Sequence, residues 1–317
     1  FEYDNFSEEM KIPINGWNNN EKEKFFKVSF TDHSTFKKEV NYFKKPRKYK
    51  FIHDSPFAFE LYESNVDPML RFMHERDITP AGFISIKHKY MVHVEPEHKT
   101  SLCDYEFHVD YDRVNPGESD KATPFIMASF DIECTSGDGT FPQATRPDDK
   151  IIQIFTTFYK YGENEPYYIH ACVLGYTSPI DGVDMECFEN EADLLMSWQK
   201  VMRAIKPDIL LGYNILGFDL QYIWGRAQYT RCVEKFRYLS KLIEHPCELE
   251  TRTFTSNAYG HTESYHLEMP GILQIDLLQI IKREHKLESY KLDFVGEHFM
   301  KERKLDVSPR QIFELFL

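Results

Sequence analysis

Hydrophobic and polar positions alternate along three consecutive segments in the middle of the chain. These segments are residues 125–134, 150–161 and 165–175, and turn-rich sequence joins each one to the next. Alternation with a period of two is typical of β-strands, and consecutive strands usually pair with each other. We therefore expect three antiparallel strands here.

The apolar period then lengthens to about 3.6 residues, as in an amphipathic helix. Six apolar side chains share one helical face between residues 189 and 206: Leu194, Leu195, Trp198, Val201, Met202 and Ile205. The apolar run at 208–214 predicts a buried strand, followed by a helix at 218–228, which implies a crossover connection and a parallel strand. Residues 272–285 pass from strand to helix, and 289–300 predict one more helix. The fold class expected is α/β with a mixed sheet.

Composition divides the chain into three regions. Residues 1–23 are polar and acidic and are expected to form an amino-terminal tail. Residues 24–120 carry short strand patterns around one amphipathic helix at 67–78, which predicts an α+β domain. The Pro, Gly, Ser and Asp content of 115–124 is typical of a connection, so a second domain is expected over 121–317.

The overall composition suits a folded protein of about two domains. Of the 317 residues, 42% are hydrophobic and 15% aromatic, enough for real cores. The net charge of -13 argues against a protein that coats DNA, yet an enzyme whose metal ions supply the positive charge is compatible with it. No secretory signal or membrane-spanning run occurs, so we expect an intracellular protein without a membrane partner. The six cysteines form no C-x-x-C pair and are expected to be free thiols.

One basic cluster stands out against this acidic background. It is "KKPRKYK", Lys44–Lys50, with Tyr42, Phe43 and Tyr49 interleaved. A solvated basic loop and a contact with a nucleic-acid backbone both stay open.

Carboxylates occur where a buried strand and a helix start are predicted. Asp131 and Glu133 of "SFDIEC" lie two residues apart, so they share one face of the strand. Two negative charges on one face repel each other, so they need either a cation or contact with solvent. The pair therefore indicates either a metal site or, more ordinarily, a solvent-exposed edge of the sheet. Asp219 is expected at the start of the helix that follows the parallel strand, where ligands of α/β sheets gather. It is equally explained as a first-turn residue favoured by the helix dipole.

Three separated motifs carry a family resemblance: "FDIEC" followed by "GTFP", then "GYNILGFDLQYI", then "QIDLLQIIKREHKLESYKLDFVGEHF". With "LYESNVDPMLRFMHERDI" at residues 61–78, they resemble the exonuclease region of family B DNA polymerases, of the eukaryotic delta type and of large DNA viruses. The resemblance covers residues 57–300. It implies a ribonuclease-H-like 3′→5′ exonuclease domain within a DNA-directed DNA polymerase. It also implies DNA and replication accessory proteins as partners, in the nucleus or at a viral replication site.

The resemblance further implies a two-metal centre. In this family the matching carboxylates hold two divalent ions, which assigns Asp131, Glu133 and Asp219 as catalytic and metal-binding residues. Paired metals clamp the attacking and leaving oxygens of phosphodiester hydrolysis. Oxygen ligands favour Mg²⁺ or Mn²⁺.

The family also holds the frayed primer end with an Asn and two Phe, which Asn214, Phe218 and Phe141 match. An aromatic face stacks on any base, which suits an editing site. Core packing is the alternative for the two phenylalanines.

Some positions depart from the family pattern. The expected Tyr-x-x-x-Asp motif is absent, and Tyr290 with Asp293 has a spacing one residue too short. We interpret Asp293 as a surface helix residue, Ser289 as the N-cap of that helix and Asp276 as structural. Since the chain ends at Leu317 without a polymerase palm, a fragment incomplete for both activities is expected.

Residues 251–271 alternate about "NAYG", which predicts a hairpin. The family has a hairpin here that helps move the primer strand, and an ordinary surface hairpin is the alternative. Two other functions stay open: a noncatalytic scaffold or template-binding region of a polymerase, and a free-standing exonuclease. The three carboxylates argue against the first, and the segment at 61–78 against the second.

Overall fold

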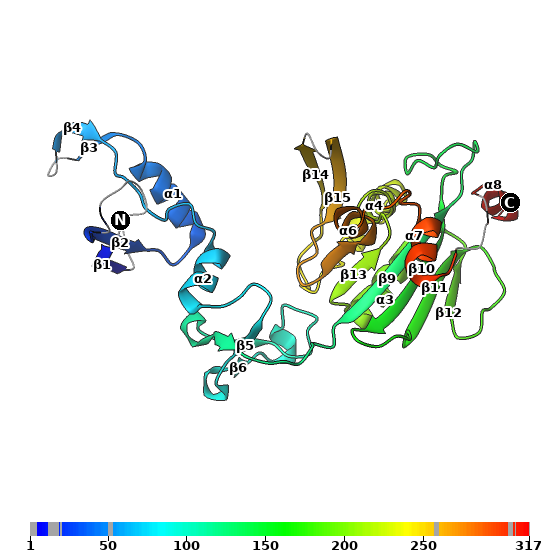
Figure 1. The fold of residues 1–317 in the computed structure, drawn as a ribbon, viewed down its shortest axis with the longest axis horizontal. Helices are drawn as coiled ribbons and strands as arrows, with labels where there is room; N and C mark the ends of the chain where they lie inside the picture. Colours follow the sequence, from blue (N-terminus) through cyan, green and yellow to red (C-terminus); the bar gives the residue numbers. More distant parts are fainter. Residues whose placement is uncertain are drawn as a thin grey trace. The chain divides into compact units, whose positions relative to one another are not determined.

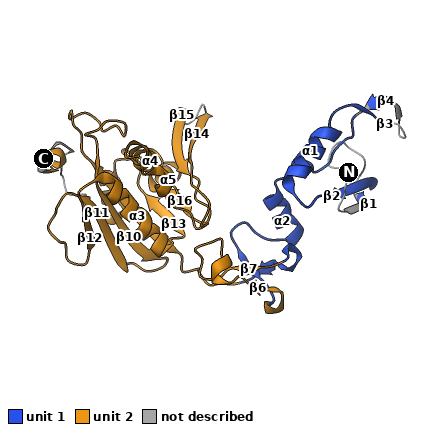
Figure 2. Ribbon diagram, turned by 180° about the vertical axis from the view of Figure 1, so that it is seen from behind, with its two compact units in different colours: residues 1–87, 110–118 blue, residues 88–109, 119–317 orange. Residues whose placement is uncertain are grey.

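A computed structural model describes residues 5–11, 19, 21–49, 53–256, 260–303, 307 and 309–316. The chain forms two compact units (Figure 2). The first contains residues 1–87 and 110–118, and the second contains residues 88–109 and 119–317. The predicted limits of the tail and of the two domains stay a prediction.

The first unit consists of short elements. They are β1 (Asn5–Lys11), β2 (Glu23–Ser29), α1 (His33–Phe43), β3 (Arg47–Tyr49), β4 (His53–Phe57), α2 (Pro68–Arg76), β5 (Phe83–Ser85) and β8 (Asn115–Gly117). Helix α2 matches the helix predicted at 67–78, and the Asp67 side chain caps it by accepting from Met69 N at 2.8 Å. Residues 5–11, which the sequence pattern assigns to a polar tail, form β1 and pair antiparallel with β2.

The second unit is built around one six-stranded mixed sheet (Figure 1). Its strands are β9 (Ile126–Cys134), β10 (Ile151–Lys160), β11 (Tyr168–Leu174), β12 (Asp184–Phe188), β13 (Ile209–Gly212) and β16 (Leu273–Asp276), in the spatial order β12-β11-β10-β9-β13-β16. Strands β9, β10 and β11 pair antiparallel, while β13 lies parallel to β9 and to β16. The predicted antiparallel series and parallel crossover are confirmed. Strand β12, parallel to β11, was not predicted.

The second unit also contains helices. They are α3 (Glu191–Ile205), α4 (Asp219–Tyr229), α5 (Val233–Phe236), α6 (Leu277–Glu284), α7 (Leu292–Met300) and α8 (Pro309–Phe316). Helix α3 contacts β10, β11 and β12, and Figure 2 shows it lying across them. Its Trp198 is fully buried against Phe130 of β9, and the indole N–H donates to Thr156 Oγ1 of β10 at 3.1 Å. The face of β9 that carries Phe130 is therefore packed against α3, and Asp131 and Glu133 lie on the opposite face.

Residues 88–109 belong to the second unit, although their short strand patterns resemble those of the preceding residues, with which the sequence analysis grouped them. They contain β6 (Val92–His93) and β7 (Phe107–His108). The N–H of Leu102 donates to Lys241 O at 2.7 Å, and the N–H of Ile243 donates to Thr100 O at 2.8 Å. These bonds join positions far apart in the sequence, which local periodicity does not reveal.

The predicted hairpin is confirmed as β14 (Leu249–Ser256) paired antiparallel with β15 (Gly260–Leu267). Its turn, residues 257–259, lies outside the described residues. Both views show the hairpin projecting away from the sheet (Figures 1 and 2). All six cysteines are free, as predicted. Over the described part of the chain, no helix is long and apolar enough to cross a membrane.

Candidate active site

Strand β9 presents Asp131 and Glu133 on one face, as the alternation predicts. Asp131 is exposed and Glu133 half-buried, while Ile132 between them is buried on the opposite face. The antiparallel register places Phe155 of β10 beside Asp131. The strand therefore carries both carboxylates toward the side of the sheet that is not covered by α3.

A tight turn connects β13 to α4 and brings Asp219 to the same region. A Cβ atom on Gly212 would lie 2.7 Å from Phe130 O, so only glycine lets the end of β13 approach β9 this closely. Asn214 then adopts a left-handed conformation with φ of 66°, which asparagine tolerates. A Cβ on Gly217 would overlap the Asn214 side-chain oxygen. Helix α4 begins at Asp219, as predicted.

Asp219 is buried beside a second carboxylate. Its side chain is 4% exposed, and burial, followed by the negative charge of Asp131, raises its pKa to about 7. Backbone hydrogen bonds from Asp219 itself and Ile132 act in the opposite direction. Burial and the charges of Asp219 and Glu133 also raise the pKa of the Cys134 thiol. The three predicted carboxylates thus share one electrostatic environment at the end of β9.

The carboxylate oxygens of Asp131, Glu133 and Asp219 are suitable ligands for a hard divalent cation, which would offset the repulsion between them. Within the residues that the structure describes, however, no three or more His, Cys, Asp or Glu side chains converge in a metal-binding arrangement. The structure brings Asp131 and Asp219 within electrostatic range and does not assemble a complete ligand set.

The two predicted phenylalanines contact each other. Phe141 is 72% exposed, and its ring meets the Phe218 ring edge to face at 5.3 Å between centroids. Phe218 is half-buried and packs on Tyr222 at 5.0 Å. Asn214 is exposed at the turn before Phe218. Core packing therefore does not account for Phe141, and accounts for Phe218 only in part.

The loop that carries Phe141 is fixed by Asp149, which sequence analysis missed. Its side chain is 1% exposed and accepts from the N–H of Gly137 at 2.9 Å and of Gln143 at 2.8 Å. The Tyr222 hydroxyl of α4 donates to Asp149 O at 2.9 Å. One carboxylate thus closes the loop on both sides of Phe141.

A buried ion pair supports the same loop from α4. Arg226 is 1% exposed and donates to both carboxylate oxygens of Glu191, with Nε to Oε1 at 2.8 Å. Its third nitrogen donates to Ala144 O and Arg146 O, at 2.9 and 2.6 Å. The sequence does contain a signal for this ion pair, because Arg226 lies among apolar residues of the helix predicted at 218–228. A buried arginine needs a carboxylate partner.

Asp276 has the structural role predicted for it. It caps α6 by accepting from Leu278 N at 3.0 Å. Asp293 is exposed in the first turn of α7, as predicted. The N-cap assignment of Ser289 is wrong, because α7 is capped at Lys291 and Ser289 Oγ instead accepts from the Lys291 N–H at 3.3 Å.

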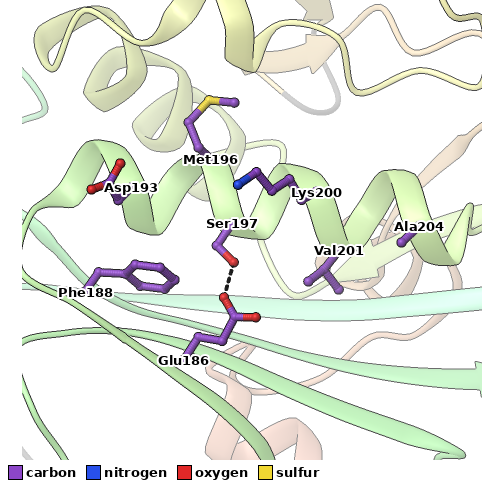
Figure 3. Close-up of a pocket in the computed structure, with 8 residues that line it drawn as sticks. All are labelled: Glu186, Phe188, Asp193, Met196, Ser197, Lys200, Val201 and Ala204. Atoms are coloured by element: carbon purple, nitrogen blue, oxygen red, sulfur yellow. Dashed lines mark hydrogen bonds between the residues drawn. The ribbon is translucent and has the colours of Figure 1, made fainter.

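A hollow of about 450 Å³ lies elsewhere, between β12 and α3 (Figure 3). It is lined by Glu186, Phe188, Asp193, Met196, Ser197, Lys200, Val201 and Ala204. Ser197 Oγ donates to Glu186 Oε2 across it. None of the six predicted site residues lines this hollow, so it is separate from the candidate site.

Comparison with known proteins agrees with the motifs. A family model for the exonuclease domain of DNA polymerase family B matches residues 59–295. The chain is 36% identical over 266 residues to a DNA polymerase of Paramecium bursaria Chlorella virus NY2A, covering 81% of this chain and 28% of that protein. It is 38% identical over 263 residues to the DNA polymerase delta catalytic subunit of Arabidopsis thaliana, covering 81% and 24%. The same subunit of Schizosaccharomyces pombe is 33% identical over 305 residues, covering 94% and 28%. The chain spans about a quarter of the length of these relatives. It therefore belongs to the DNA polymerase B family, within which it matches the exonuclease domain.

Proposed function

We propose that this chain is the proofreading region of a replicative DNA polymerase, which hydrolyses the terminal phosphodiester of a primer in the 3′→5′ direction. The observation that carries the proposal is that the negative charge of Asp131 acts on the buried Asp219 and raises its pKa, next to the contact between the exposed Phe141 and the half-buried Phe218. Family membership supports it. The strand order, with an antiparallel series followed by parallel strands, supports a ribonuclease-H-like domain.

Asp131, Glu133 and Asp219 would hold Mg²⁺ or Mn²⁺, which would supply an activated water and neutralise charge on the scissile phosphate. The remaining residues bind the strand. Phe141 and Phe218 offer adjacent ring surfaces to an unpaired terminal base, and the exposed Asn214 lies at the neighbouring turn. Stacking is tolerant of base identity, as proofreading requires.

The proposal extends to partners and location. The substrate is the single-stranded 3′ end of a primer on its template, and replication accessory proteins act with the polymerase in the nucleus or at a viral replication site. The basic cluster at 44–50 is a further candidate for backbone contact, although Arg47 of β3 lies 4.1 Å over the Tyr42 ring. Residue 50 lies outside the described residues.

The test is a double substitution in the full-length protein. Asp131→Ala with Glu133→Ala should abolish removal of mispaired primer ends and leave nucleotide incorporation nearly unchanged, because synthesis would use separate residues. The matched control is Glu163→Ala with Glu165→Ala, which removes two exposed carboxylates at the same spacing from the turn after β10. Loss of both activities with an intact fold would contradict a separate editing site. Full exonuclease activity in the double variant would contradict any catalytic role for β9.

A further inference from the structure

The turn that carries Asn214 is held by a carboxylate from a neighbouring strand. Asp276, the last residue of β16, lies opposite Gly212 in the parallel register and is 4% exposed. Its Oδ1 accepts from the Asn214 N–H at 2.8 Å, and its Oδ2 accepts from the Leu216 N–H at 3.1 Å. Oδ1 also accepts from Leu278 N. One side chain therefore caps α6 and fixes the backbone of the turn.

The opposite side of this turn is held by the hairpin. The N–H of Tyr265 in β15 donates to Leu216 O at 2.8 Å. Gln274, two residues before Asp276 and on the same face of β16, exchanges two hydrogen bonds with the backbone of Leu267. Leu216 is thus held through both its N–H and its carbonyl, and β16 anchors the turn and the hairpin together.

We propose that Asp276 is a positioning residue of the exonuclease site. Its carboxylate sets the backbone at Asn214 and Leu216, and through this backbone it places Asn214 and Phe218 against the single strand. Capping of α6 requires only one acceptor oxygen, and Oδ1 supplies it by accepting from Leu278 N. The second oxygen, Oδ2, accepts from the Leu216 N–H of the turn and has no part in the cap. The inference rests on the proposed function of this site.

The substitution Asp276→Asn separates the two roles. Asparagine is as good an N-cap as aspartate, so the bonds to Leu278 and Asn214 can persist. The amide nitrogen then faces the Leu216 N–H, donor against donor, and a buried donor without an acceptor is costly. We expect about tenfold weaker binding of a single-stranded oligonucleotide in Ca²⁺, equivalent to about 1.4 kcal/mol. The KM for exonuclease cleavage should rise more than kcat falls, and the melting temperature should fall moderately, because the unpaired donor also destabilises the fold.

The matched control is Asn190→Ala, which removes the N-cap of α3, where the Asn190 side chain accepts from Asp193 N at 3.0 Å. It should lower the melting temperature and leave oligonucleotide affinity unchanged. Amide hydrogen exchange provides a second measurement. Peptides covering residues 213–218 should exchange faster in Asp276→Asn, while peptides covering the start of α6 should not.

Wild-type affinity and KM in Asp276→Asn would overturn the inference, as would faster exchange confined to α6. Both measurements should be made in the full-length protein below its unfolding temperature, so that a moderate loss of stability does not obscure them. Absence of metal-dependent cleavage in the wild-type protein would instead contradict the proposed function. Binding and exchange would still test whether Asp276 sets the turn.

Discussion

Replacement of Phe141 by alanine distinguishes strand binding from packing more sharply than any other change at this site. Phe141 is 72% exposed, so roughly a quarter of the about 1.5–3 kcal/mol available to a fully buried aromatic or aliphatic side chain is at stake. Its edge-to-face contact with Phe218 adds about 0.5–1.5 kcal/mol. We expect the free energy of unfolding to fall by about 1–2 kcal/mol at most.

Loss of one base–aromatic stack costs about 1–3 kcal/mol, which corresponds to a dissociation constant larger by about 5- to 150-fold. The loss should be similar for all four terminal bases, because every base has a face to stack. Affinity is measured by titrating the full-length protein with labelled single-stranded oligonucleotides that differ only at the 3′ end. The titration uses Ca²⁺ at fixed salt concentration, since phosphate contacts depend on salt.

Two further variants complete the experiment. Phe141→Leu keeps apolar contact with Phe218 without a flat ring, so it should weaken binding almost as much as alanine while retaining more stability. Tyr176→Ala, at an 87% exposed aromatic after β11, should change neither quantity. The reasoning is refuted if Phe141→Ala binds oligonucleotides like the wild type while its unfolding free energy falls by more than about 2 kcal/mol.

Two other predictions concern the buried charges. Arg226→Met leaves Glu191 buried and unpaired and should lower the free energy of unfolding by about 3–5 kcal/mol, measured by urea denaturation. Arg303→Ala, which breaks an exposed pair with Glu297, should cost about 1 kcal/mol or less, and equal losses would contradict the importance of burial. Without divalent metal, the raised pKa of Asp219 contributes stability that is present below about pH 4 and is lost as the pH rises through about 7. Denaturation measured at about pH 5 and about pH 8 should show this loss of stability in the wild type and not in Asp219→Asn. Adding Mg²⁺ should restore the stability of the wild type at the higher pH. A pH dependence that persists in Asp219→Asn would assign the effect to another group.

Local patterns were sufficient to predict the strand that carries Asp131 and the helix that begins at Asp219. Both depend on periodicity and on the position where a parallel strand ends, and these are properties of short segments. The residues that support the site were missed because their partners are distant in the sequence. Arg226 and Glu191 are 35 positions apart, and Asp276 is 60 positions from Leu216.

Two polar segments have a local structure that their composition does not indicate, and each has a physical cause. Strand β1 is acidic and resembles a tail, but Lys24 pairs with Glu8 at 2.8 Å and Lys27 with Glu9 at 3.2 Å across the β1–β2 pair. Cross-strand charge pairs can support a polar strand without an apolar face. Serine is a favourable N-cap residue, yet Ser289 lies three residues before α7 begins, and its hydroxyl accepts from the Lys291 N–H in a local turn.

The two loops of the candidate site share one design. In each loop, the exposed residue that would contact the DNA strand belongs to a backbone segment that a buried carboxylate holds by hydrogen bonds. Asp149 holds the loop of Phe141, and Asp276 holds the turn of Asn214. Buried carboxylates are costly unless they are hydrogen-bonded; Asp149 accepts from two backbone N–H groups and Asp276 from three. Such support holds contact residues in place before the substrate arrives, which reduces the entropy lost on binding. Because the chain as a whole is acidic, this preorganised surface should attract an anionic strand only when divalent cations occupy the carboxylates beside it.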